Sequence, residues 1–446
     1  MRYLLINGRS ISFNASIRFL VTSGVNLMHV AHVVDRYLPG LLTGSQVYMK
    51  NLSEGLNERM NTASVVTSNA LDGPALTNPR SGSLSKRSFE KINGVNIYRF
   101  PIDYHVQASC KLFNGIFEKF IPGFRSDITR LFALRPFMLR MYFYLASNQG
   151  AYDLVHATPL PFVHAWLAAK ACQKSKTPFV VTPFFHVSSS AYYNPELIGI
   201  LKNANAVFAC TDIERKALVN LGVYLEKIKI VPMGINEKDF AGCSGERFRN
   251  KFDLHGKFLI LFAGSKAYDK GAIHVLNAVE KLAEKRSDVV LVATGLDTPE
   301  WTTAVRRIRK KSFLLDLPYT SLDAFNVNFH YMHAMEKADI FDACDVLVMP
   351  SRADAFGIVY LEAWYLGKPV IGARCGGVPA VISDGIDGFL VKFGDLNDIV
   401  AKINLLINSP ALAEKLGSMG RKKVIASYTW PTIVDNVRRI YEEIIA

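Results

Sequence analysis

The chain has 446 residues, 50% of them hydrophobic and 11% aromatic, enough to bury the cores of two or three globular domains. Its six cysteines show neither C-x-x-C pairing nor metal-ligand spacing, which argues against a disulfide framework or structural zinc and for a reducing, cytoplasmic setting. No apolar run approaches the ~20 residues that span a bilayer.

The net charge of +13 is concentrated near the N-terminus. Residues 1–150 carry 17 Lys and Arg against 8 Asp and Glu, or +9, and the rest of the chain carries only +4. A basic region of this kind attracts nucleic acid, anionic lipid or a phosphorylated substrate, and the charge by itself does not choose among them. Because no nucleic-acid motif is recognisable, we expect no nucleic-acid partner.

Residues 1–24 lack the apolar segment of a secretory signal and are interpreted as an N-terminal extension of uncertain status. A series of strands alternating with helices follows, which is typical of a parallel, doubly wound sheet. Its strands are predicted at VNLMHVAHVV (25–34), TASVVTS, NIYRF, YDLVHA (152–157), PFVVTPFFH (178–186) and AVFACT (206–211).

A second series of the same kind opens beyond a boundary near residues 232–240. Its strands are predicted at FLILFAG (258–264), VVLVATG (289–295), VNFHYM (327–332), DVLVMPS (345–351), PVIGAR (369–374) and GFLVKF (388–393). The sequence therefore predicts an α/β fold with two Rossmann-like domains, at residues 25–235 and 236–425, and a C-terminal helical segment at 426–446.

Residues 109–146 mix aromatic side chains with arginines at five-residue spacing. These are Arg125, Arg130, Arg135 and Arg140. Five-residue spacing drifts around a helix, so the arginines do not form one basic stripe. Two interpretations stay open: a core-packed helical hairpin with solvated arginines, or an interfacial helix that contacts anionic membrane.

Two carboxylates stand out in the stretch DVLVMPSRADAFGIVYLEAWYLGKPVIG (345–372). Asp354 follows an apolar strand and Glu362 lies in an otherwise apolar helix, where a carboxylate is costly unless it accepts hydrogen bonds. Asp354 could accept bonds from sugar hydroxyls and Glu362 from a ribose, or they could be an N-cap and an ordinary ion pair. The turn between them predicts a phosphate site at the backbone N–H groups of Phe356, Gly357 and Ile358.

Other candidates lie at further strand-to-helix turns. Lys266 and Lys270 follow the strand FLILFAG, where ammonium groups could neutralise a diphosphate. Gly44 lies in the first such turn, LLTGSQ, and His186 ends the strand PFVVTPFFH. Singly, each is more often a solvated lysine, a turn glycine or a structural histidine; together they predict a site between two domains.

With these motifs in place, the sequence resembles the family 4 retaining glycosyltransferases of the GT-B fold. The resemblance covers about residues 28–60 and 150–441. It rests on DAFGIVYLE, which matches the family motif E-x-F-G-x-x-x-x-E, and on GKPVI, GGVP, DGIDGFLV and YTW after it.

The resemblance implies two Rossmann-like domains facing across a cleft, with a C-terminal helix that crosses back to the N-terminal domain. It implies that Asp354 and His186 lie at the transferred sugar, that Glu362 binds the ribose and that Lys270 binds the diphosphate, which the Gly44 loop also approaches. It implies retention along a front-face path, no metal, and no cofactor besides the nucleotide-sugar donor.

Three positions depart from the family pattern. Asp354 stands where the motif has its first Glu, Ser265 stands where an Arg is usual, and Ala380 stands where an acidic residue often follows GGVP. Lys266, beside Ser265, could supply a charge but not the bidentate fork of an Arg. We expect these departures to affect donor affinity more than the fold.

The sequence thus predicts transfer of a hexose-type sugar from a UDP- or GDP-sugar to a hydroxyl of a glycan, lipid-linked or small-molecule acceptor, with peripheral contact to anionic membrane left open. The alternatives are a GT-B sugar phosphorylase or nucleotide-sugar epimerase, and, less favoured, a non-catalytic basic protein that binds membrane or nucleic acid. A dinucleotide dehydrogenase is least favoured because neither first turn has G-x-G-x-x-G.

Overall fold

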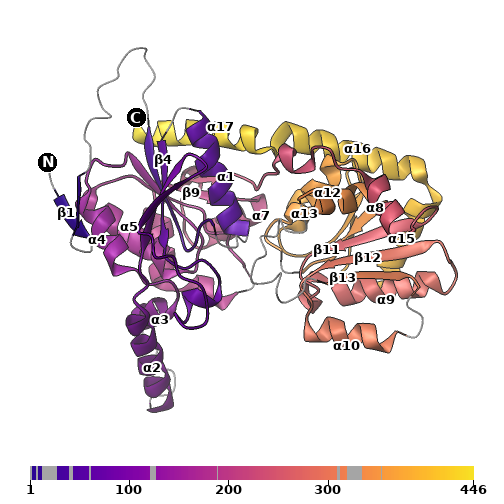
Figure 1. The fold of residues 1–446 in the computed structure, drawn as a ribbon, viewed down its shortest axis with the longest axis horizontal. Coiled ribbons are helices and arrows are strands. Elements are labelled where there is room, and N and C mark those ends of the chain that lie inside the picture. The colour runs from indigo at the N-terminus through magenta and orange to yellow at the C-terminus, as the bar shows by residue number, and fades with distance from the viewer. Residues whose placement is uncertain are drawn as a thin grey trace.

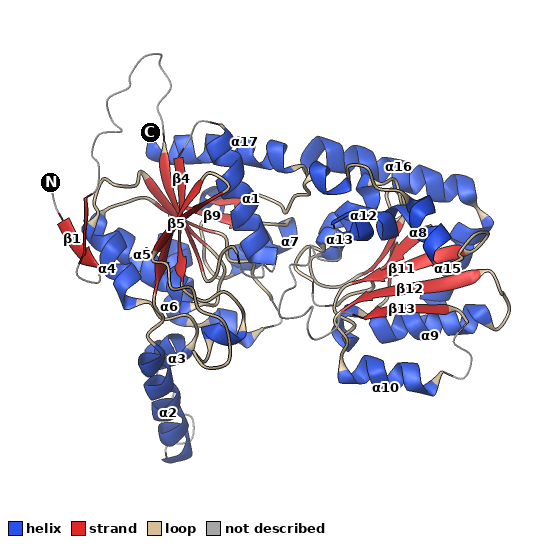
Figure 2. Cartoon of the chain, in the orientation of Figure 1, coloured by secondary structure: helices blue, strands red, loops and turns tan. Residues whose placement is uncertain are grey.

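The computed structural model shows two α/β domains side by side, with the C-terminal helices running along both of them (Figure 1). It describes residues 3–6, 9–12, 28–39, 44–59, 62–120, 127–187, 189–308, 312–318, 334–352 and 354–446. Each domain is built on one sheet that helices cover (Figure 2). The predicted pair of Rossmann-like domains is confirmed.

The N-terminal sheet is parallel except for its last strand, which forms an antiparallel hairpin with its neighbour. Its spatial order is β10 (Ile228–Ile230), β9 (Ala206–Ala209), β8 (Phe179–Val181), β7 (Leu154–Ala157), β3 (His29–Val34), β4 (Thr62–Ser68), β6 (Val95–Phe100) and β5 (Phe89–Ile92). The chain runs outward in both directions from β3, so the β3–β7 pair is the switch point, where α/β sheets bind ligands.

Alternate residues of β3 enter two different cores because side chains alternate across a strand. Val30 and Val34 pack in one core with α1, and Ala31 and Val33 in a second core with α5. The helices of this domain are α1 (Gly44–Glu58), α2 (Tyr104–Phe120), α3 (Asp127–Ala133), α4 (Leu139–Ser147), α5 (Val163–Ser175), α6 (Pro195–Asn203) and α7 (Asp212–Asn220). Short 3₁₀ turns are η2 (Pro74–Leu76), η3 (Ser190–Tyr193) and η4 (Leu225–Lys227).

The C-terminal sheet is parallel throughout, and its switch point lies between β11 and β14. Its order is β13 (Leu314–Pro318), β12 (Val289–Gly295), β11 (Phe258–Ala263), β14 (Val346–Val348), β15 (Val370–Ala373) and β16 (Phe389–Val391). The helices around it are η5 (Glu237–Phe240), α8 (Gly245–Lys251), η6 (Tyr268–Lys270), α9 (Ala272–Ala283), α10 (Pro299–Arg307), α12 (Ala334–Ala343), α13 (Ile358–Tyr365), α14 (Val378–Val381) and α15 (Leu396–Asn408).

The chain ends by crossing back to the N-terminal domain, as expected. Helix α16 (Pro410–Ser427) packs against α13, and α17 (Trp430–Ile445) packs against α1 (Figure 1). Tyr441 anchors α17: its hydroxyl lies 2.5 Å from His156 Nδ1 and 3.3 Å from His32 Nε2. All three side chains are buried, so these bonds and the apolar face of α17 fasten the helix to the first domain.

Three strands of the two domain sheets escaped prediction, namely β5, β10 and β13, and each lies at the edge of its sheet. Edge strands bury fewer side chains, so their apolar pattern is weak; β5 alternates between exposed and half-buried residues only. The strand predicted at 327–332 lies outside the described residues. Within the predicted extension, β1 (Tyr3–Ile6) and β2 (Arg9–Ser12) pair with each other in a separate two-stranded sheet.

Candidate functional site

Asp354 and Lys270 meet at the switch point of the C-terminal sheet. Lys270 ends the turn η6 after β11, Asp354 follows β14, and the lysine ammonium pairs with Asp354 Oδ1. Asp354 Oδ2 is buried and accepts no hydrogen bond from any residue that the structure describes. Arg352 holds η6 in place, since its backbone N–H donates to Asp269 O at 3.0 Å and its guanidinium pairs with the Asp269 carboxylate.

The Gly376–Gly377 turn, which begins the GGVP motif, contacts the backbone of Asp354. The Gly377 N–H donates to the Asp354 carbonyl at 2.8 Å. A Cβ on Gly377 would lie 1.7 Å from the Ala355 carbonyl oxygen, so only glycine permits this approach of two backbones. The glycine pair therefore acts on Asp354 through the backbone.

Helix α13 begins at Ile358 directly after Gly357, which has φ +90°. A Cβ there would lie 2.4 Å from the ring of Tyr360, whose hydroxyl donates to Met349 O at 2.5 Å. Glycine thus lets the helix start tightly against β14. The N–H groups of Phe356, Gly357 and Ile358 precede the first hydrogen-bonded turn, the part of a helix that leaves N–H groups for other acceptors.

Glu362 is 9% exposed in the apolar part of α13. Its Oε1 lies 2.5 Å from the ammonium of Lys337 in α12, so the ion-pair interpretation holds for one oxygen. Its Oε2 is buried and has no partner among the described residues. The Lys337 ammonium therefore balances the charge of the carboxylate, while one of its two oxygens accepts no hydrogen bond from the described residues. Lys337 was missed from the sequence, because nothing in its helical neighbourhood marks it as the partner of a residue 25 positions later.

His186 brings the N-terminal domain to this group. Burial lowers the pKa of His186 below its usual value, the Lys270 ammonium lowers it further, and the Asp354 carboxylate opposes both. An electrostatic effect of this kind requires the three side chains to lie near one another. The segments that follow β8, β11 and β14 therefore lie near one another where the two domains adjoin.

Lys266 does not join this group. Its side chain is fully buried, and its ammonium lies 2.8 Å from Asp297 and 2.5 Å from Asp316, with the Trp301 ring 5.4 Å away. These partners follow or lie in β12 and β13, on the far side of β11 from Asp354. The structure therefore shows Lys266 in a buried ion-pair group of the C-terminal domain, whereas the sequence suggested a diphosphate contact.

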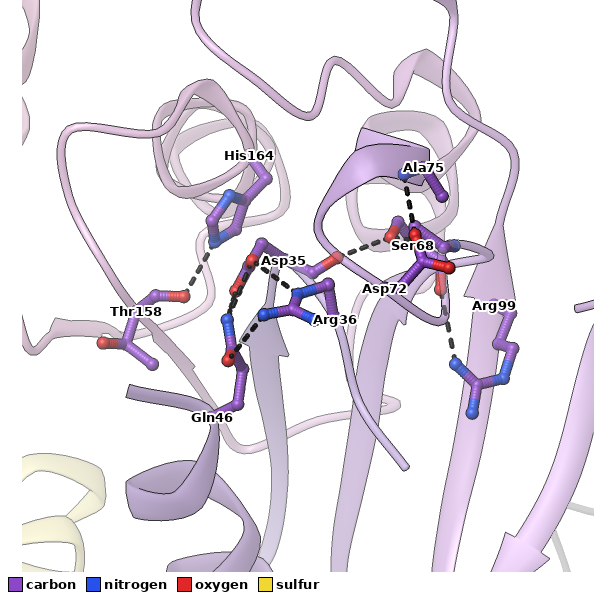
Figure 3. Close-up of polar contacts among 10 residues, drawn as sticks. Asp35, Arg36, Gln46, Ser68, Asp72, Ala75, Arg99, Thr158 and His164 are labelled. Carbon is purple, nitrogen blue, oxygen red and sulfur yellow. Dashed lines mark hydrogen bonds and ion pairs between the residues drawn. The ribbon is translucent and has the colours of Figure 1, made fainter. Parts of the chain in front are cut away.

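Gly44 is the first residue of α1, and residues 40–43 before it are outside the described part of the chain. A polar group at the switch point of the N-terminal sheet holds this end of α1 (Figure 3). Asp35, directly after β3, accepts bonds of 2.7 and 2.9 Å from Gln46 Nε2, and Ser68 at the end of β4 donates to the Asp35 carbonyl at 2.5 Å. His164 donates to Thr158 O at 2.7 Å beside it.

Two other features bear on ligands. Among the described residues, no three His, Cys, Asp or Glu side chains gather as they would around a metal ion. A surface hollow of about 260 Å³ lies at the opposite, amino end of β8, lined by residues including Cys172, Lys176, Phe179 and Asn203. It is remote from the group around Asp354 and has no part in it.

Two parallel α/β domains, with polar residues at both switch points and a returning C-terminal helix, define the GT-B class of fold. The family described as Glycosyl transferases group 1 matches residues 245–423, and Glycosyltransferase Family 4 matches residues 42–239. The chain therefore belongs to the glycosyltransferases that these two family models describe.

Relatives agree with this assignment, and a solved structure shows the same fold. An MMP alpha-(1->4)-mannosyltransferase of Mycolicibacterium hassiacum is 23% identical over 90% of this chain and 95% of its own length. A D-inositol 3-phosphate glycosyltransferase of Streptomyces griseus is 28% identical over 68% of this chain and 69% of its own length. The crystal structure of Anabaena HepE in complex with UDP-glucose superimposes with a TM-score of 0.67, at 17% identity, over 93% of this chain and 100% of that one.

Proposed function

We propose that the protein is a retaining glycosyltransferase that moves a hexose from a UDP- or GDP-sugar to an acceptor hydroxyl. The observation that carries the proposal is the pair of buried carboxylate oxygens, Asp354 Oδ2 and Glu362 Oε2, neither of which has a partner among the described residues. Each carboxylate is already balanced by a lysine, so hydroxyl groups suit the remaining acceptors. A nucleotide sugar carries hydroxyls on both its sugar and its ribose.

The residues divide the donor between them. Glu362 accepts a bond from the ribose, and Asp354, with His186 opposite, orients the transferred sugar. Lys270 and the N–H groups that begin α13 bind the diphosphate, where they stabilise the negative charge that develops as it leaves. Lysine supplies here the positive charge that a metal provides in other transferases.

Retention follows if the acceptor oxygen approaches the anomeric carbon on the face from which the phosphate departs. The bond between that carbon and the phosphate oxygen breaks, the bond to the acceptor oxygen forms, and the acceptor proton passes to the departing phosphate oxygen. The N-terminal domain supplies the acceptor side. The anomeric configuration of the product, read by NMR, tests this step, and an inverted product contradicts it.

Calorimetric titration with UDP, GDP and ADP tests donor binding. We expect saturable binding of UDP or GDP. Glu362→Gln should weaken this binding more than tenfold, because it replaces the charged carboxylate beside Lys337 with a neutral amide. Glu414→Gln, at an exposed position of α16, is the matched control and should bind as the native protein does. An unchanged nucleotide affinity in Glu362→Gln would contradict the proposed hydrogen bond between Glu362 and the ribose.

We also propose that the acceptor is lipid-linked or anionic and that the protein contacts the membrane through α2. Helix α2 projects from the body of the N-terminal domain (Figures 1 and 2) and exposes Leu112 and Ile116, four residues apart on one face, with Ile128 of α3 exposed nearby. Leu112 is 65% exposed. Exposed aliphatic side chains on a basic domain are typical of interfacial helices. No helix in the described ranges is long and apolar enough to cross a membrane.

Liposome flotation tests this contact. We expect the protein to float with vesicles that contain anionic lipid and not with neutral vesicles, and Leu112→Gln with Ile116→Gln to abolish flotation. Leu405→Gln, an exposed position of α15 in the other domain, is the control. If the native protein fails to float with anionic vesicles, the proposed membrane contact is wrong. The donor site is tested separately, by the calorimetric titration.

A further inference from the structure

A buried carboxylate in the N-terminal domain binds the backbone next to His186. It has no part in the donor site described above. Glu214 is 4% exposed in the first turn of α7. Its Oε1 accepts the Phe185 N–H and its Oε2 accepts the Cys210 N–H, both at 2.7 Å. One carboxylate thereby joins the segment after β8 to the end of β9, and the residue next to Phe185 is His186.

The backbone that Glu214 holds is strained. Phe184 has φ +50°, a left-handed conformation that is a genuine outlier for a bulky side chain. Such residues persist only where their surroundings enforce them, and they cluster at functional sites. Two features enforce this one: the Phe184 ring packs edge-on against Tyr48 of α1 at 5.4 Å, and Glu214 holds the next N–H.

We propose that Glu214 is a positioning residue for His186, holding the Phe184–Phe185 backbone in the conformation that presents the imidazole to Lys270 and Asp354 across the domain boundary. This rests on the proposed function, since the place of His186 at the transferred sugar is part of that proposal. A neutral side chain at position 214 cannot accept both N–H groups equally, so the negative charge is what the geometry requires.

The same carboxylate makes this arrangement sensitive to pH. Burial raises the pKa of Glu214 to about 7, against the opposing effect of the two N–H groups. The titratable groups that face it are Tyr192 of η3, Cys210 after β9 and Tyr48 of α1, and burial raises the pKa of each, so they stay neutral between pH 6 and 8. Because protonation removes one of the two acceptors, we expect kcat to fall as the pH decreases through about 7.

His186 is not the source of that change. Burial, and then the Lys270 ammonium, hold the pKa of His186 below its usual value, so the imidazole loses its proton at a lower pH than the Glu214 carboxyl does. A loss of activity toward lower pH that disappears when Glu214 is replaced therefore belongs to Glu214.

A double-mutant cycle tests the proposal, with release of nucleoside diphosphate from UDP-glucose or GDP-mannose, whichever nucleotide the calorimetry selects, as the readout. We expect Glu214→Gln to lower kcat about tenfold, the effect of about one charge-assisted hydrogen bond, and to leave the dissociation constant for the nucleotide within about twofold. His186→Asn should lower kcat as well, and the double variant should be no slower than His186→Asn. Glu196→Gln, which changes a carboxylate of α6 bonded to Trp166, is the control.

The outcomes separate the two proposals. If His186→Asn is impaired and Glu214→Gln lowers kcat by the same factor with or without His186, the positioning role is wrong and the proposed function stands. If His186→Asn keeps full turnover, its role in the proposed function fails and the inference fails with it. The pH profile of the native protein needs no variant: a kcat that is flat from pH 6 to 8 contradicts the proposal even where Glu214→Gln does not fold.

Discussion

Replacing Lys266 and Lys270 one at a time by methionine separates stability from donor binding in two lysines four residues apart. Lys266 is fully buried between Asp297 and Asp316, whose side chains are 38% and 25% exposed. Breaking a fully buried pair costs about 3–5 kcal/mol, and water can reach these aspartates, so we expect Lys266→Met to lower the free energy of unfolding by about 2–3 kcal/mol. For a domain of this size that is a decrease in Tm of roughly 4–12 °C.

Lys270 differs in both respects. Its side chain is 29% exposed and pairs with Asp354, whose side chain is 13% exposed, so its loss should lower the free energy of unfolding by about 1–2 kcal/mol, less than the loss of Lys266. The proposed site gives Lys270 a charge-assisted bond to the diphosphate, so we expect the loss of its ammonium to weaken nucleotide binding about 10- to 100-fold.

Urea unfolding and calorimetric titration with UDP and GDP, carried out on both variants, measure the two effects. Each variant serves as the control for the other, because the substitution is the same and the two positions follow the same strand. Loss of nucleotide affinity in Lys266→Met without loss of stability would refute the assignment, since the Lys266 ammonium would then have to reach the donor.

Two further substitutions test the support of the site and the docking of the last helix. Gly377→Ala forces a Cβ against the Ala355 carbonyl and should weaken nucleotide binding more than tenfold. Gly199→Ala in α6, where a Cβ meets nothing within 4 Å, is the control and should bind nucleotide as the native protein does. Equal nucleotide affinity of the two variants would contradict the role of the backbone contact. Tyr441→Phe leaves His156 Nδ1 buried without its hydroxyl partner, so it should lower the free energy of unfolding by about 1–3 kcal/mol. Urea unfolding measures this change, and an unchanged midpoint would contradict the proposed anchoring of α17.

Much of the architecture could be predicted from the sequence because strands buried on both faces give continuous apolar runs. The central strands of both sheets were found in this way, and the weakly buried edge strands β5, β10 and β13 were missed. Asp354, Lys270 and His186 could be assigned to one region because each follows a strand, and parallel strands end at one edge of a sheet.

The partners of the charged side chains could not be predicted. Lys266 and Lys270 follow the same strand, and only the fold sends one into a buried group with Asp297 and Asp316 and the other to Asp354. Glu214 stands three residues after Thr211, the spacing of a capping box, which predicts a bond back to the Thr211 N–H. The carboxylate instead accepts from Phe185 and Cys210.

Apolar periodicity and local motifs therefore specify the two-domain fold, the family and the strand-to-helix turns of the candidate site, and all three could be inferred from the residues in order. Three-dimensional packing is needed to know which carboxylate each lysine neutralises, that Glu362 pairs with Lys337 through one oxygen, and that Glu214 binds the backbone next to His186. The physical reason is that a buried charge takes its partner from whichever chain segment the packing brings within hydrogen-bond distance, and that segment can lie anywhere in the sequence.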